Sequence, residues 1–286
     1  MNTGNEDIKK SFSARTGIRF NPQSSLMISF NESVSSNING YNIDIRSTTR
    51  DYIGFGSYLS KGFPFSNWSF RVGGLEKISF IKPYVSSMSL EHSFSGKQNL
   101  SWKFNEQGIM PINLFNISSF EDGNDDYLQF SRISRSFSPL IGISTTFNNG
   151  ISTNLRSNIT HTLDEVANGL TYISDNSILA TLTYNFSKGI RFPLPFSERN
   201  IYLRNNMNIS LNLDFSNKTE EGSKDKINFV EQNFTNTQKS VLRITYTLTD
   251  DITGSLFYEY RQTDTRLTGR RIDRDFGINL NVAIRG

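Results

Sequence analysis

The chain has 286 residues, of which 36% are hydrophobic and 13% aromatic, and it contains no cysteine. Its formal net charge is +3 and its mean hydropathy is −0.43. The lack of cysteine excludes disulfides and thiolate metal sites, and the dispersed Lys and Arg residues do not form the basic stripe of a nucleic-acid-binding protein, so no nucleic-acid partner is expected. No apolar run approaches the roughly 18 residues of a transmembrane helix.

The N-terminal segment, residues 1–10, is polar and charged. We expect it to be disordered, and it lacks the apolar core of a secretory signal. If the protein is exported, the export information is therefore expected upstream, in a longer chain of which this sequence is a fragment.

From residue 11 onward, apolar and polar side chains alternate in one segment after another, which is the pattern of half-apolar strands. Asn39-Gly40, Gly96-Lys97 and Asn148-Asn149-Gly150 separate such segments and are typical of hairpin turns. The alternating runs cover residues 12–20, 26–30, 41–45, 88–94, 100–104, 141–147, 151–159, 178–186, 203–215, 242–248, 256–260 and 276–284.

These runs predict an all-β fold of roughly 12–16 antiparallel strands over residues 11–286, with no linker that divides it. Many runs span about ten residues, enough for a tilted strand to cross a bilayer, and low hydropathy is compatible with such strands because only every second residue must be apolar. We therefore expect a transmembrane β-barrel, or a segment of a very large barrel, in the bacterial outer membrane.

Three stretches break the alternation. Residues 62–83 are expected to form a loop with one helical turn, and residues 106–126 and 216–240 are expected to form polar loops. Long loops on one side of the membrane and tight turns on the other are usual for outer-membrane barrels.

The acidic stretch around residues 121–126 contains the one weak candidate for a metal site. Asp122, Asn124 and Asp126 have the spacing that begins a calcium loop, but Tyr127 and Ile133 stand where such a loop needs Gly and Glu. A solvated loop tip explains the same residues. No cofactor is expected.

His92 and His161 are the only histidines. A membrane hydrolase would need a histidine oriented between a serine and a carboxylate, and no Gly-x-Ser-x-Gly elbow occurs. Asp125-Asp126 and Asp250-Asp251 resemble turn residues rather than acid–base pairs. We therefore expect ordinary strand histidines, no catalytic residue and no enzyme.

Two surface features fit a membrane protein, and each has another explanation. Arg261, Arg266, Arg270, Arg271 and Arg274 either contact lipid phosphate or form a self-neutralising loop with nearby Asp residues. Trp68, Tyr84 and Trp102 either belong to interfacial aromatic belts or are buried aromatics of a soluble sheet.

Several segments resemble the SprA (Sov) family. They are residues 67–78 with 80–82 and 89–94, residues 137–143 with 149–153, and the last two strands from Ser240 through residues 258–260 to the end. The resemblance covers most of the chain from about residue 11, although the N-terminal bulk of the family is missing and the final residue, Gly286, is not aromatic.

Members of that family form the outer-membrane translocon of the type IX secretion system in Bacteroidetes-related bacteria, which is linked to gliding motility. The resemblance implies a C-terminal piece of a very large barrel, with membrane lipid around it, folded secreted cargo passing through its lumen, and lipoprotein and plug subunits as partners. A stand-alone porin-like or ligand-transporting barrel, an outer-membrane hydrolase and a soluble β adhesin are the alternatives.

Overall fold

The computed structural model describes residues 5–39, 42–103, 128–166, 168–186, 190–193, 200–203, 205–249 and 251–283. Nearly all of them lie in strands, with short 3-10 turns at η1 (Ser57–Leu59) and η2 (Leu75–Lys77). Within these ranges no helix has the length and apolar character needed to cross a membrane.

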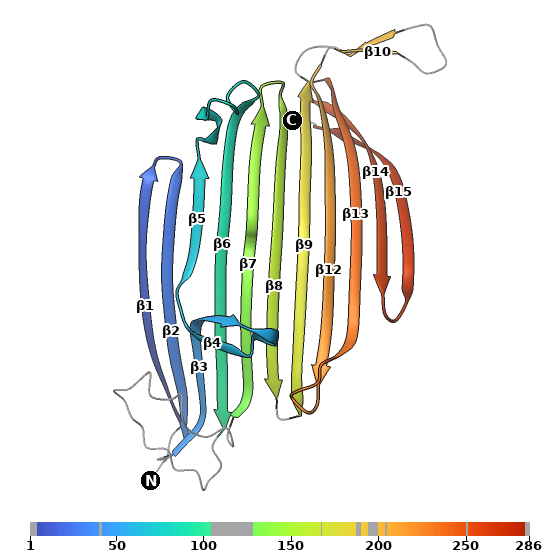
Figure 1. Cartoon of the computed structure of the whole chain (residues 1–286). Coiled ribbons are helices and arrows are strands. Elements are labelled where there is room, and N and C mark those ends of the chain that lie inside the picture. Colours follow the sequence, from blue (N-terminus) through green and yellow to red (C-terminus); the bar gives the residue numbers. More distant parts are fainter. Residues whose placement is uncertain are drawn as a thin grey trace.

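One antiparallel sheet of thirteen strands contains almost the whole described chain, which confirms the all-β prediction and its strand number (Figure 1). β10 (Ile190–Pro193) and β11 (Asn200–Leu203) form a separate pair. The strands of the sheet are β1 (Asn5–Asn21), β2 (Ser24–Asn39), β3 (Asn42–Phe55), β4 (Lys61–Pro64), β5 (Asn67–Gly73), β6 (Val85–Lys103), β7 (Leu128–Phe147), β8 (Ile151–Val166), β9 (Gly169–Phe186), β12 (Met207–Ser223), β13 (Val230–Thr249), β14 (Ile252–Thr265) and β15 (Gly269–Val282).

Neighbouring strands are mostly consecutive in the chain, because hairpins join them at two rims. The upper rim in Figure 1 carries the turn at residues 148–150, and the lower rim carries the turn at residues 224–229. β1 has β2 as its one partner among the described strands, and β15 has β14. The sheet is therefore open between these two edges, and both edge strands run towards the upper rim.

The register gives the sheet one apolar and one polar face. Leu182 on β9 lies opposite Leu211 on β12, while the next pair, Thr181 and Asn212, faces the other way. Only seven apolar side chains of the described residues are buried, and many large ones are exposed: Ile278 on β15 is 71% exposed and Ile178 on β9 is 49% exposed. Such a face requires an apolar environment outside the sheet.

Two segments expected to lack regular structure are strands. Residues 5–10, expected to be disordered, pair with residues 34–39 as the start of β1. Most of the stretch 216–240, expected to be a loop, belongs to β12 and β13, whose turn is confined to residues 224–229. Both predictions were wrong because the β1–β2 and β12–β13 hairpins continue, through backbone pairing, into stretches whose side chains are polar.

Two further predictions along β5 and β6 were wrong in part. Gly96-Lys97 is not a turn but lies inside β6, and residues 67–73 of the expected loop form β5. The predicted helical turn within residues 62–83 is present as η2. A Cβ atom on Gly96 would lie 2.0 Å from the Tyr52 carbonyl oxygen, so this glycine allows another backbone to cross close to β6.

Candidate functional site: the two faces of the wall

The apolar face has a continuous band that ends at a sharp lower boundary. On β12 the band extends from Met207 to Phe215, which is close to the roughly nine to eleven residues that a tilted strand uses to cross a bilayer. Below it, Asn217 lies between Asn176 of β9 and Asn236 of β13. Exposed members of the band include Ile141, Leu155, Ile178, Leu182, Phe215, Leu242, Leu256 and Ile278.

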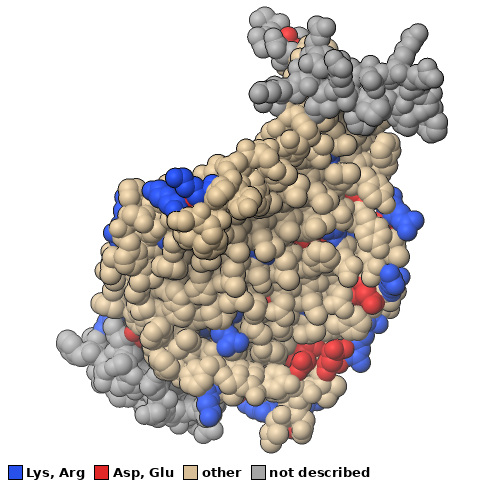
Figure 2. Space-filling view, turned by 45° about the horizontal axis from the view of Figure 1, so that its top comes forward, with Lys and Arg blue, Asp and Glu red and all other residues tan. Residues whose placement is uncertain are grey.

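The surface in Figure 2 is largely free of charged side chains, which gather mainly towards its margins. This is the front of the sheet in Figure 1, where β4 crosses in front of β6 and β7. A broad uncharged surface of this kind suits contact with lipid tails, since a charge at the bilayer centre is costly.

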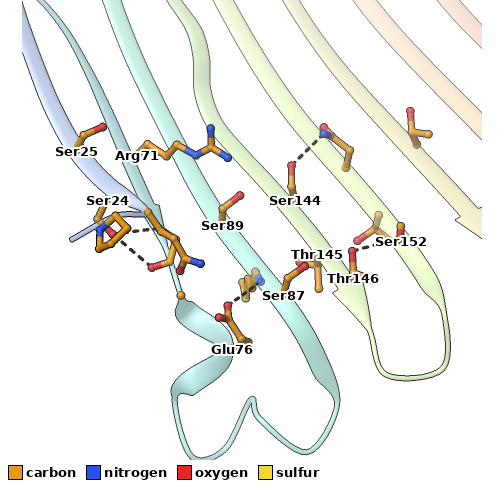
Figure 3. A pocket seen from close by; sticks show the side chains of 18 of the residues that line it. Ser24, Ser25, Arg71, Glu76, Ser87, Ser89, Ser144, Thr145, Thr146 and Ser152 are labelled. Carbon is orange, nitrogen blue, oxygen red and sulfur yellow. Dashed lines mark hydrogen bonds between the residues drawn. The ribbon is translucent and has the colours of Figure 1, made fainter. Parts of the chain in front are cut away.

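The polar face is lined by hydroxyl and amide side chains that bond across neighbouring strands. Thr181 donates to Asn212 over 3.0 Å, and Asn158 donates to Ser177 over 3.2 Å. Near the upper rim this face is hollowed into an open cavity of about 690 Å³ that spans β1 to β9 (Figure 3). Arg19, Arg71 and Glu76 are its charged lining residues, so the cavity is suited to water and polar solutes.

Several charged side chains on the polar face form ion pairs. Glu91 of β6 lies 2.9 Å from Arg156 of β8 and 3.7 Å from Arg71 of β5. Arg156 reaches Glu91 past β7 because the residue between them in the register is Gly142. Arg132 and Asp164 form a second pair at 2.6 Å. In both pairs a basic and an acidic side chain on the same face offset each other's charge.

One strand position in the sheet is occupied by two strands in line. The lower part of β2 pairs with β3 and its upper part with β5, and β6 pairs with the same two strands on the other side. Between them the chain leaves the sheet as the crossing hairpin, residues 52–66, which contains the end of β3, η1 and β4.

Side chains supply the hydrogen bonds that this interruption removes from the ladder. The Asp51 carboxylate, which belongs to a residue only 1% exposed, accepts the Asn31 backbone N–H of β2 over 2.8 Å. On the other side, the Asn67 side-chain oxygen accepts the Gly96 N–H of β6 over 2.8 Å. The Phe65 N–H donates to the Asp51 carbonyl over 3.2 Å. The interruption therefore leaves these backbone N–H groups satisfied, as a membrane environment requires.

His92 has a comparable structural role at a bulge in β7. The register between β6 and β7 shifts between Glu91 and Phe94, and His92 Nδ1 lies 2.6 Å from the Leu140 carbonyl oxygen. Because that oxygen only accepts, Nδ1 carries the proton. Ser93 donates to the Ser138 carbonyl beside it. His92 therefore satisfies the backbone rather than pairing with a serine and a carboxylate.

His161 of β8 is hydrogen-bonded through Nδ1 to the Tyr172 hydroxyl of β9. The described residues contain no group of three or more His, Cys, Asp or Glu side chains able to hold a metal ion. Asp122, Asn124 and Asp126, the calcium candidates, lie outside the described residues, as do Asp125 and Asp250.

The C-terminal arginines are largely partnered within their own hairpin, and most of them lie in strands rather than in a loop. Arg261 lies 2.9 Å from Glu259, Arg271 lies 2.9 Å from Asp273, and Arg270 donates to Gln262 over 2.7 Å. These contacts favour the self-neutralising interpretation. The lipid-phosphate interpretation is not needed to explain them.

The three candidate belt aromatics lie at different levels. Trp68 stacks on Phe94 at the lower boundary of the apolar band, with ring centroids 4.1 Å apart. Tyr84 is 70% exposed in the loop that leads into β6 at the upper rim. Trp102 lies further down β6, opposite Arg46 of β3. Trp68 and Tyr84 therefore have positions that fit two belts, and Trp102 does not.

No protein-family model and no curated protein matches this chain. Among solved structures, the chain is similar to a loop L8 deletion mutant of OmpT, an outer membrane protein of Vibrio cholerae. The sequences are 8% identical, the TM-score is 0.29, and the match covers 97% of each chain. A TM-score this low carries no argument about function.

Proposed function

We propose that this chain forms part of the wall of a bacterial outer-membrane translocon of the SprA type, which exports folded proteins by the type IX route. The observation that carries the proposal is the parallel direction of the two edge strands, combined with the division of the sheet into an apolar and a polar face. The sequence resemblance to the SprA family supplies the identity of the translocon.

The edge strands argue for a wall that continues beyond these strands. β3 and β5 share one position and β4 lies off the wall, so the wall has an odd number of positions and β1 runs parallel to β15. Bacterial single-chain barrels have an even number of antiparallel strands, and every edge in lipid must be paired. Further strands between β15 and β1 would satisfy both requirements.

The mechanism that we propose is passive. The apolar band contacts lipid tails, while the hydroxyl and amide side chains of the polar face contact water and the moving cargo. Ion pairs such as Arg156–Glu91 leave little unbalanced charge to hold a folded cargo protein at one place. Lipoprotein and plug subunits would bind at the rims and gate the lumen.

Depletion of the protein in the bacterium that encodes it tests this function. We expect secreted cargo to accumulate in the periplasm and to disappear from the medium, measured by quantitative proteomics of both fractions. Unchanged secretion, together with heat-modifiable migration of the isolated 286-residue chain, would instead support a stand-alone porin-like barrel whose edges close on each other.

A pair of proline variants tests whether the outer edge of β15 is used. Successive N–H groups of a strand point to opposite edges, so one of Ile278→Pro and Asn279→Pro removes a bond to β14 and the other affects only the outer edge. In a continuous wall both variants lose membrane assembly. Loss in one variant alone would contradict a paired edge and favour a soluble sheet.

A further inference from the structure

The crossing hairpin lies on the apolar side of the wall, below the band. A Cβ atom on Gly54 would lie 2.9 Å from Ile133 of β7, and the Arg135 side chain donates to the Gly54 carbonyl over 3.3 Å. Ile133 is opposite Leu163 in the register, on the same face as Leu155 of the band. The hairpin therefore covers the outside of the wall rather than its lumen.

The inner side of the crossing hairpin is fixed to the sheet at its tip. Leu59 is 1% exposed, and the Tyr58 ring stacks on Phe229 with centroids 3.8 Å apart and meets Tyr172 edge-on at 5.0 Å. The Tyr58 hydroxyl is hydrogen-bonded to the Glu221 carboxylate of β12, which raises the pKa of that hydroxyl. These contacts hold the tip across to β9 and the β12–β13 turn.

The outer side of the hairpin exposes three phenylalanines. Phe55, Phe63 and Phe65 are 40%, 48% and 43% exposed, and each ring meets the next edge-on at 6.0 and 5.7 Å. Phe65 meets Trp68 at 6.0 Å, and Trp68 stacks on Phe94, which lies opposite Phe137 in the row just below the apolar band. The three exposed rings are therefore joined to the apolar band through Trp68 and Phe94. They lie just below the boundary at which that band ends.

We propose that the crossing hairpin is a lipid-binding element, whose Phe55, Phe63 and Phe65 side chains insert into the headgroup layer of the outer membrane at the lower rim. Aromatic rings favour that layer, where the bilayer changes from apolar to polar. The hairpin thereby fixes the height of the wall in the membrane at its interrupted strand. This inference rests on the proposed membrane-wall function and adds that lipid headgroups contact the outer side of the crossing hairpin.

Because the chain has no cysteine, single labelled cysteines can test the depth of the hairpin. The full protein, carrying Phe63→Cys labelled with a polarity-sensitive fluorophore, is placed in phosphatidylcholine vesicles that contain lipids with a nitroxide quencher near the headgroup or deep in the tail. We expect blue-shifted emission and several-fold stronger quenching by the shallow nitroxide. Emission like that in water, with no quenching, would overturn the inference.

Two matched labels separate failure of the inference from failure of the proposed function. A label at Leu182→Cys in the apolar band should be quenched most by the deep nitroxide, and one at Asn154→Cys on the polar face should not be quenched. If the Leu182→Cys label is unquenched, the membrane wall itself is wrong. If only the Phe63→Cys label behaves like water, the hairpin inference is wrong.

A second variant tests the rings directly. In protein labelled at the exposed Lys61→Cys position, changing Phe55, Phe63 and Phe65 to Ser should reduce shallow quenching several-fold without altering the Leu182→Cys signal. Unchanged quenching would contradict insertion of the rings. A label that is shielded in whole outer membranes but not in lipid vesicles would show that a protein partner covers the hairpin, and would also overturn the inference.

Discussion

Backbone hydrogen bonding is completed in different ways in two regions of the sheet. One region is the unbroken strands β8, β9 and β12, and the other is the interrupted position shared by β3 and β5. In the unbroken strands, continuous registers pair the backbone from rim to rim. Their side chains are therefore not needed for backbone hydrogen bonds and can face the surroundings on either side of the sheet. At the interruption, Asp51 and Asn67 are committed to backbone N–H groups of the neighbouring strands. A long antiparallel sheet can therefore be interrupted if side chains complete its hydrogen bonds.

The largest effect is expected from a charge in the unbroken region. Leu211→Arg places a cation near the middle of the apolar band, whereas Asn212→Arg places it on the polar face. We expect Leu211→Arg to lower the free energy of unfolding by about 2–4 kcal/mol, as lipid-facing arginines do near the bilayer midplane. Urea unfolding in lipid vesicles measures both, and equal losses would contradict the assignment of the two faces.

The interrupted position should be most sensitive at Asp51. Asp51→Ala leaves the Asn31 N–H without its acceptor, and we expect the free energy of unfolding to fall by about 1–3 kcal/mol. Asp51→Asn keeps an acceptor oxygen and should lose less. The same unfolding measurement compares the variants, and an Asp51→Ala protein as stable as the parent would show that the carboxylate is not needed there.

At the bulge in β7 a side chain again completes a backbone hydrogen bond, and we expect a smaller loss of stability when it is removed. His92→Ala removes the donor to the Leu140 carbonyl and should lower the free energy of unfolding by about 1 kcal/mol. Any secretion activity should persist, because His92 is assigned to the backbone. His92→Asn, which retains a donor, is the control; loss of activity with unchanged stability would point instead to a catalytic histidine.

The smallest effect is expected in the exposed turn below the hairpin tip. The Asp225 carboxylate accepts the N–H groups of Asn228 and Ile227, and these bonds hold its pKa well below the ordinary value. Its contribution is complete above the ordinary pKa of about 4 and is lost as the pH falls below that value. Asp225→Ala should lower the melting temperature slightly at pH 7, and the difference from the parent should shrink towards pH 3, as measured by circular dichroism. A difference that does not change with pH would contradict this.

The alternating sequence was sufficient to predict the strand-rich fold and its two faces. Residues 178–186 of β9 and 207–215 of β12 fall in predicted runs because side-chain direction alternates with every residue, which is a local property of the backbone. The predicted run 203–215 was wrong at its start, since Leu203 belongs to β11 and β12 begins at Met207. An ordinary strand position for His92 was also expected, because the sequence showed no serine and carboxylate arranged around it. The sequence left the C-terminal arginines open between lipid phosphate and their acidic neighbours, and the side-chain contacts within the hairpin favour the second.

Only the tertiary structure decided where the wall is interrupted and what crosses it. Gly96 resembled a turn residue, although its role is to allow the Tyr52 backbone to pass close to β6. Nothing in the sequence indicated that the side chains of Asp51 and Asn67 accept hydrogen bonds from backbone N–H groups of neighbouring strands. The polar stretch 216–240 resembled a loop because its strands are held by backbone pairing to distant segments. The sequence by itself determined the alternation and hence the two faces, whereas pairing between residues far apart in the chain decided the interruption, the crossing hairpin and the open edges.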